Sequence, residues 1–182
     1  MKGVVFQLLS QVVTEARGEE TWESLLDRTG LDGAYTSLGS YPDGDLARLV
    51  EAASAALGES PEAALRWFGR QALPLLAAKD PRFLGGHRST IPFLLTHNEV
   101  IHPEVRKIYP GADVPVFEFV RPDEKTLLVR YNSPRRLCAL AEGLIEGAAA
   151  RLGETVAMNQ SKCMHRGDTH CEIRCEFERR GA

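Results

Sequence analysis

With 182 residues, of which 43% are hydrophobic, the chain is long enough for one domain with a real core. Its 22 basic and 25 acidic residues are interspersed and give a net charge of -3, so there is no basic stripe to bind a phosphate backbone, and we expect no nucleic-acid partner. No uncharged apolar run approaches the length of about 18 residues that a membrane span needs, so we expect a cytoplasmic protein with no membrane partner.

The first hundred residues predict helices joined by short loops. Apolar residues recur at steps of three and four, and glycines stand where two of the periodic stretches end. Asp43 is expected to cap one helix, and Ser60 caps the next, with Pro61 as its first residue. The expected helices are 4–17, 19–30, 43–58 and 60–78.

The second half changes period. Residues 91–109 are helical in pattern but interrupted by Pro103, whereas 116–120 and 126–132 flank a short polar connection, which is typical of a β-hairpin. A long helix is expected over 135–153, followed by strands over 155–160 and 170–178. The sum is an α+β fold, with a helical half followed by a small antiparallel sheet and one helix across it.

The stretch YNSPRRLC, residues 131–138, holds a row of hydrogen-bond donors. In an extended chain Tyr131, Ser133 and Arg135 share one face over roughly 13 Å. An arginine fork fits one carboxylate, and two hydroxyls beside it suit a second, so the row favours a ligand with two carboxylates. The alternative is a solvated strand end, with Ser133 as the N-cap of the following helix and Pro134 as its first residue.

His102 closes the apolar stretch FLLTHNEVIH. A neutral imidazole on such a wall can bind a metal, although a single histidine there is also compatible with a core or capping residue.

His102, the segment GADVP with Pro115, and the Tyr-x-Ser-x-Arg pattern together resemble the heme nitric oxide/oxygen binding (H-NOX) family, related to the heme domain of soluble guanylate cyclase. The resemblance covers essentially the whole chain. It implies a single H-NOX domain over 1–182, with a helical subdomain of about 1–83, a proximal subdomain of about 84–182 and heme b between them. It also implies that His102 is the proximal iron ligand, that Tyr131, Ser133 and Arg135 clamp the propionates, and that Pro115 presses on the porphyrin.

Pro103 departs from what a ligand-bearing helix needs. A residue that precedes proline is pushed away from helical backbone angles, so we expect the helix to break or kink at His102.

The resemblance also bears on the choice of gas. Members that bind oxygen stably place a tyrosine over the iron, because oxygen gains negative character there and needs a donor. Alignment puts Leu140 at that position, and none of the implied distal residues can donate a hydrogen bond, although all of them are equally compatible with ordinary core positions. These residues are Val5, Leu9, Ala72, Leu140 and Leu144.

A non-enzymatic nitric oxide sensor is therefore expected. Signalling would follow loss of the bond between His102 and iron and relaxation of the heme against Pro115. By analogy with the family, the partner is a separate histidine kinase or a cyclic-di-GMP enzyme, that is, a diguanylate cyclase or phosphodiesterase.

The last third of the chain is rich in cysteine, which in a reducing compartment favours metal or redox chemistry over disulfides. Similar endings in some bacterial H-NOX proteins carry zinc, which implies Cys138, Cys163 and Cys171 as ligands here. Gln160 stands where those proteins have their histidine ligand. The fourth ligand stays open among Cys175, His165, His170 and water, and Cys175 is disfavoured because a strand would place it about 13 Å from Cys171.

Several alternatives remain for this segment and for the chain. The thiols are also compatible with inert buried residues, with a disulfide, or with a redox switch in which oxidants release zinc. For the whole chain, the rivals are a zinc or thiol redox protein and a heme-free regulatory domain that binds another small ligand.

Overall fold

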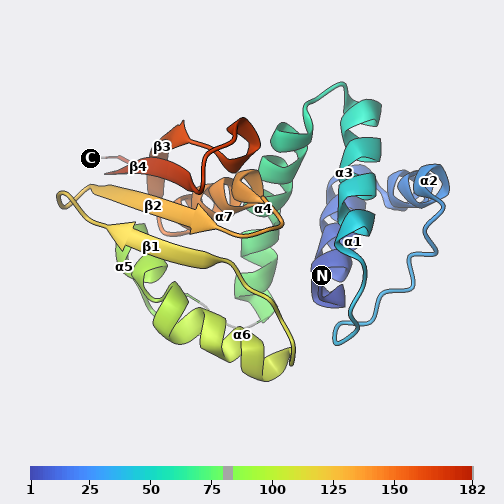
Figure 1. Ribbon diagram of the computed structural model, residues 1–182, viewed down its shortest axis with the longest axis horizontal. Helices are drawn as coiled ribbons and strands as arrows, with labels where there is room; N and C mark the ends of the chain where they lie inside the picture. Colours follow the sequence, from blue (N-terminus) through green and yellow to red (C-terminus); the bar gives the residue numbers. More distant parts are fainter. Residues whose placement is uncertain (80–83, 182) are drawn as a thin grey trace.

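The computed structural model describes residues 1–79 and 84–181 (Figure 1). Its helical half contains α1 (Gly3–Arg17), α2 (Glu19–Thr29), α3 (Asp43–Leu57) and α4 (Pro61–Lys79). The other half contains α5 (Thr90–Leu95), a π-helical turn η1 (His97–Ile101), α6 (His102–Ile108), β1 (Val116–Val120), β2 (Thr126–Asn132), α7 (Cys138–Arg151), β3 (Glu154–Lys162), the short 3-10 turn η2 (Met164–Arg166) and β4 (Cys171–Arg179). The predicted α+β fold is confirmed.

The helical half follows the sequence pattern closely. Gly30 and Gly58 take left-handed backbone angles directly after α2 and α3, as expected of glycines that end helices. Ser60 Oγ accepts a hydrogen bond from the N–H of Ala63 at 3.2 Å, which caps α4. The expected cap of α3 is corrected, because Asp43 is its first helical residue and Pro42 precedes it.

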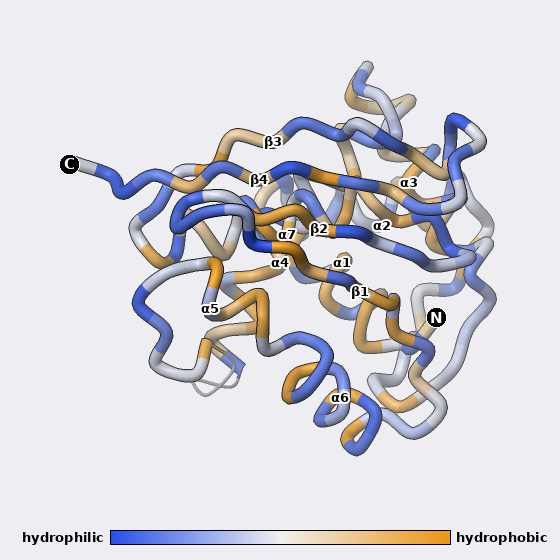
Figure 2. Tube along the Cα trace, turned by 60° about the vertical axis from the view of Figure 1, so that its left-hand side comes forward, coloured by the Kyte–Doolittle hydropathy of each residue, from blue (hydrophilic) through white to orange (hydrophobic). Residues whose placement is uncertain are grey.

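The four strands form one antiparallel sheet in the order β1-β2-β4-β3. The hairpin between β1 and β2 is confirmed, and Asp123 Oδ1 tightens its turn by accepting the N–H groups of Lys125 and Thr126. Alternate residues of β2 and β4 are buried on one face of the sheet. Hydrophobic segments of the strands and of α4, α5 and α7 gather in the middle of the molecule in Figure 2.

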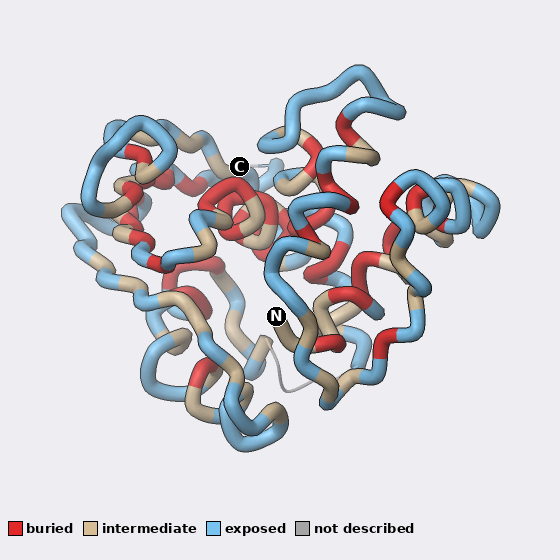
Figure 3. Tube along the Cα trace, turned by 45° about the vertical axis from the view of Figure 1, so that its right-hand side comes forward, coloured by how far each residue is buried: buried red, intermediate tan, exposed pale blue. Residues whose placement is uncertain are grey.

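Helices α4 and α7 pack unusually closely and join the two halves. A methyl group added at Gly143 of α7 would collide with the carbonyl oxygen of Arg66 on α4, and one added at Gly69 of α4 would lie 2.5 Å from the carbonyl oxygen of Leu140. Buried Glu142 pairs with Arg66 across the same contact. In Figure 3, buried stretches of the chain gather near the centre of the molecule, where these two helices lie.

Two expectations about helix boundaries are corrected. The stretch 91–109 is not one helix broken at Pro103, since His102 keeps helical angles of φ -65° and ψ -38° and the irregularity lies in the π turn before it. Helix α7 begins at Cys138 with Leu137 at the N-cap position, so Ser133 does not cap it. Among the described residues, no helix is both long and apolar enough to cross a membrane.

Candidate functional site

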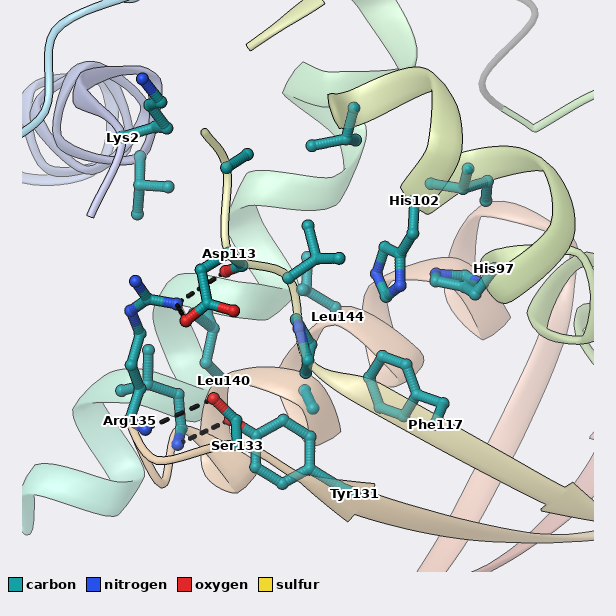
Figure 4. Close-up of a pocket in the computed structure, with 18 of the residues that line it drawn as sticks. Lys2, His97, His102, Asp113, Phe117, Tyr131, Ser133, Arg135, Leu140 and Leu144 are labelled. Carbon is teal, nitrogen blue, oxygen red and sulfur yellow. Dashed lines mark hydrogen bonds and ion pairs between the residues drawn. The ribbon is translucent and has the colours of Figure 1, made fainter. Parts of the chain in front are cut away.

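A cavity of about 510 Å³ lies between the helical half and the sheet, within the size range of small-molecule sites. Leu140 and Leu144 of α7 line one side, and His102 and Phe117 line another (Figure 4). Pro115, in the segment that leads into β1, also lines it. The structure thus brings residues far apart in the chain around one largely apolar space.

The distal residues named from the sequence divide into two groups. Val5, Leu140 and Leu144 line the cavity, and none has a side chain that donates a hydrogen bond. Leu9 and Ala72 do not belong to the lining but are buried in the core of the helical half. Helical spacing could not separate these groups, because both are apolar and both face inward.

His102 is the first residue of α6 and is only 8% exposed. Its ring stacks on Phe117, with 5.7 Å between ring centroids and 23° between planes. Burial, followed by the charges of His97 and Arg106, lowers the pKa of His102 to about 4. The imidazole is therefore neutral near pH 7 and has a lone pair to offer a metal.

His97 is a second imidazole on the same wall, which the sequence analysis did not identify. Its ring centroid lies 5.7 Å from that of His102, with the planes at 89°. Its Nδ1 donates to the carbonyl oxygen of Leu94 at 3.0 Å. Burial lowers the pKa of His97 against the opposing effect of backbone hydrogen bonds at Leu94 and Phe93. Regular helical spacing places residues five apart on different faces, so only the π turn reveals this neighbour.

The row of donors from residue 131 does not follow an extended strand. Strand β2 ends at Asn132, and Arg136 takes a positive φ of 53°. Tyr131, Ser133 and Arg135 nevertheless all line the cavity. The Tyr131 hydroxyl accepts the N–H of Leu137 at 3.0 Å, and Ser133 Oγ accepts the N–H of Arg135 at 3.3 Å.

Two carboxylates hold the Arg135 guanidinium. Its Nε donates to Asp43 Oδ2 at 2.9 Å, and its Nη1 donates to Asp113 Oδ2 at 2.9 Å and to the Asp113 carbonyl oxygen at 2.6 Å. Desolvation raises the pKa of Asp43, but hydrogen bonds from the N-terminal ammonium and Arg135 outweigh it and lower that pKa overall. The Arg135 guanidinium is thus placed to donate hydrogen bonds to carboxylates at this edge of the cavity.

The cysteines form a separate cluster. The Sγ atoms of Cys138, Cys163 and Cys171 lie within 4.8 Å of one another, and all three residues are buried. Burial raises the pKa of Cys138, and it raises that of Cys171 to about 12. Bare thiols of this kind are protonated and unreactive at neutral pH, whereas a bound cation would deprotonate them.

None of the suggested fourth ligands belongs to this cluster. Cys175 is buried in the core between α7 and the sheet, where desolvation raises its pKa to about 12. His165 Nε2 bonds the Arg136 carbonyl oxygen at 2.7 Å, and His170 Nδ1 bonds Thr169. Gln160 Nε2 is buried without a hydrogen-bond partner among the described residues, and the side chain lies close enough to lower the pKa of Cys138.

A family model described as Haem-NO-binding matches residues 2–160. An H-NOX protein from S. oneidensis solved in the Fe(II)NO state is 29% identical, with a TM-score of 0.90 over 98% of this chain and 99% of that one. An H-NOX protein from K. algicida, Fe(II) and unliganded, is 24% identical, with a TM-score of 0.88 over 100% of this chain and 99% of that one, and this likeness concerns the fold. A search of curated proteins finds no match.

Proposed function

The chain belongs to the Haem-NO-binding, or H-NOX, family, and on that basis we propose that it is a heme-based sensor that binds nitric oxide and excludes oxygen. Domains of this family are gas sensors and not catalysts. One observation carries the proposal for this chain: a cavity of about 510 Å³ combines apolar walls with His102, a buried and neutral imidazole, and a guanidinium at its edge.

The residues present fit heme. A flat apolar ring with two carboxylates needs apolar walls, an axial nitrogen and an anion clamp. His102 would supply the axial nitrogen, and Tyr131, Ser133 and Arg135 would hold the propionates, in place of the acidic groups that now engage Arg135. Pro115 lines the cavity and would contact the porphyrin.

Selection among gases would rest on the distal wall. Heme held by these residues would supply a ferrous iron that can bind a diatomic gas. Stable oxygen binding calls for a hydrogen-bond donor, because oxygen gains negative charge on binding, and Val5, Leu140 and Leu144 offer none. Nitric oxide depends less on such a donor, so these side chains favour it.

Signalling would start at His102. With heme bound through His102, nitric oxide would favour release of that side chain, which would free the start of α6. Pro115, in the segment before β1, would then be free to shift its part of the wall. The close crossing of α4 and α7 couples that side to the helical half. A separately encoded histidine kinase or cyclic-di-GMP enzyme is the partner that we propose to read this change.

We also propose zinc at Cys138, Cys163 and Cys171, because three buried sulfurs within 4.8 Å of one another suit a tetrahedral ion. Water, or Gln160 through its amide oxygen, would complete the site. Without a cation, burial raises the pKa of Cys138 and Cys171 and keeps these thiols protonated, whereas a bound zinc ion would hold them as thiolates.

Reconstitution with heme tests the main proposal. The purified protein should give a strong Soret band. The absorption spectrum of the ferrous form should change when nitric oxide or carbon monoxide is added. In air, the ferrous form should show no spectrum of an oxygen complex before the iron is oxidised. In His102→Ala the axial ligand is lost, and added imidazole should restore the parent spectrum. A protein that takes up no heme, or whose His102→Ala variant has the parent spectrum without imidazole, would refute the proposal.

A further inference from the structure

Two imidazoles, not one, stand on the proximal wall of the cavity. His97 and His102 both line it, with 5.7 Å between ring centroids and 89° between ring planes. Figure 4 shows the two rings side by side. Phe93 and Phe117 pack edge to face on His97, at 5.1 Å and 6.0 Å between centroids, and thereby limit the orientations of its ring.

The backbone explains why these two residues meet. In a regular α-helix, residues five apart project about 140° from each other. Here the N–H of His102 bonds the carbonyl oxygen of His97, an i to i+5 pair of the π turn, and this wider turn places one residue nearly above the other. Pro103 follows directly and has no N–H for the carbonyl four residues earlier, which accounts for the wider turn at this point.

The hydrogen bond of His97 fixes which of its nitrogens can accept. A carbonyl oxygen only accepts, so Nδ1, which contacts the Leu94 oxygen at 3.0 Å, carries the hydrogen. In the neutral ring, Nε2 then has a free lone pair. No donor among the described residues is bonded to it.

His102 lacks the complementary partner. Neither of its ring nitrogens has a hydrogen bond among the described residues, although it is only 8% exposed. A histidine that ligates a metal through one nitrogen nearly always donates its other N–H to an acceptor. Two ionisable groups lie close enough to lower the pKa of His102, namely His97 and Arg106. Arg106 has only donors, whereas the neutral ring of His97 has a nitrogen that can accept.

We propose that His97 Nε2 accepts the N–H of the proximal imidazole, so that His97 positions His102 and strengthens its bond to the iron. This inference rests on the proposed heme-binding function. Two imidazoles joined by an N–H···N bond of about 3 Å have centroids about 5 Å apart, which is close to the 5.7 Å that separates these two rings. The bond makes the ligating nitrogen more basic and opposes release of His102 when nitric oxide binds.

Three variants separate this role from simple packing. His97→Phe keeps a ring of similar size between the two phenylalanines but has no acceptor. His97→Gln places an amide oxygen near the position of Nε2, whereas His97→Asn has the same chemistry but reaches only as far as Nδ1. His97→Gln is therefore the rescue variant, and His97→Asn is its matched control.

The measurement is the iron–histidine stretching frequency of the unliganded ferrous protein, by resonance Raman spectroscopy. We expect it to fall in His97→Phe and His97→Asn and to stay near the parent value in His97→Gln. Release of His102 after nitric oxide binding, followed by stopped-flow absorption, should accelerate about tenfold in the first two variants.

The outcomes distinguish the two levels of the argument. If all three variants take up heme normally through His102 and keep the iron–histidine stretching frequency of the parent, the role of His97 is overturned. The sensor proposal is then unaffected. A protein that takes up no heme overturns both. A fall of equal size in His97→Gln and His97→Asn points to packing and also overturns the hydrogen-bond role.

Discussion

Arg135 donates from Nε to Oδ2 of Asp43 at 2.9 Å, although 92 residues separate the two in the chain. Asp43 begins α3 in the helical half, whereas Arg135 lies between β2 and α7, so the pair ties the two halves together at the edge of the cavity. The same guanidinium is the group that we propose for the heme propionates. Heme binding and the contact between the halves therefore draw on one side chain.

The first prediction concerns this pair. In the heme-free protein, a double-mutant cycle of Asp43→Asn and Arg135→Gln should give a coupling of about 0.5 kcal/mol in the free energy of unfolding, because Asp43 is largely exposed. Denaturant titration measures it. Asp45→Asn, which removes a separate ion pair with Arg48, is the control and should show no coupling to Arg135. Coupling of equal size in the control would contradict a specific link.

The second prediction concerns pH. The pKa of His102 is about 4 in the folded protein against an ordinary 6.5, so between these values the unfolded chain binds more protons. The stability that is present above pH 6.5 should fall by about 2 kcal/mol as the pH drops toward 4, which is less than the full difference in pKa implies because solvent in the cavity screens the charge. The heme-free His102→Phe variant should lose that share of the slope in denaturant titrations at a series of pH values. An identical slope in both proteins would show that other groups are responsible.

The third prediction concerns zinc. Cys171→Ala should reduce the zinc content of the purified protein strongly, whereas Cys175→Ala, which removes an equally buried thiol outside the cluster, should retain it. Elemental analysis measures both. Gln160→His should tighten zinc by about tenfold or more in a competition with a chromogenic chelator, equal to about 1.4 kcal/mol. Equal zinc loss in both cysteine variants would argue against the three-sulfur site.

The fourth prediction concerns the distal wall. Leu140→Tyr introduces a hydroxyl into the cavity and should yield a ferrous protein that binds oxygen reversibly, because the hydroxyl supplies the missing donor. Absorption spectra in air-saturated buffer give the result. Leu140→Phe adds the same ring without the donor and should still fail to bind oxygen. Oxygen binding by the phenylalanine variant would mean that space, not a donor, decides.

The fifth prediction concerns the crossing of α4 and α7. Gly143→Ala should lower the free energy of unfolding by about 3 kcal/mol or more, since the methyl group would meet the Arg66 carbonyl. Gly44→Ala is the matched control in α3, where nothing lies within 4 Å of the added methyl group. That substitution should raise stability by about 0.5 to 1 kcal/mol. Equal effects of the two substitutions on thermal unfolding would refute the close approach as the cause.

Much of the fold could be predicted from the sequence, because the helical half and the hairpin have clear periods and explicit end signals such as Gly30 and Ser60. The start of α7 could not. Pro134 predicts that a helix begins near Ser133, but Arg136 takes a positive φ and the helix begins only at Cys138. Local propensity does not contain the tertiary contacts that set this boundary.

For the candidate site, the sequence named several residues that line the cavity, but it also named Leu9 and Ala72, which do not line it. His102, Pro115 and Arg135 line one cavity, and their roles toward heme stay predictions. The acidic neighbours of Arg135, Asp43 and Asp113, come from distant segments of the chain, so no local sequence pattern could predict them. The sequence does not indicate His97, because a regular helix would direct its side chain to another face than that of His102. Pro103 predicts an irregular backbone at His102, whereas the irregularity lies in the turn before it.

Helix α7 meets a different neighbour on each of its sides. Cys138 faces the thiol cluster, Leu140 faces the cavity, Gly143 touches α4 and Ile145 packs in the core against the sheet. Most of its 14 residues are buried. We expect saturation mutagenesis to find few tolerated substitutions anywhere along α7. Positions in α7 that tolerate no substitution would then reflect packing against four different neighbours. Intolerance alone would not show that a position contacts heme.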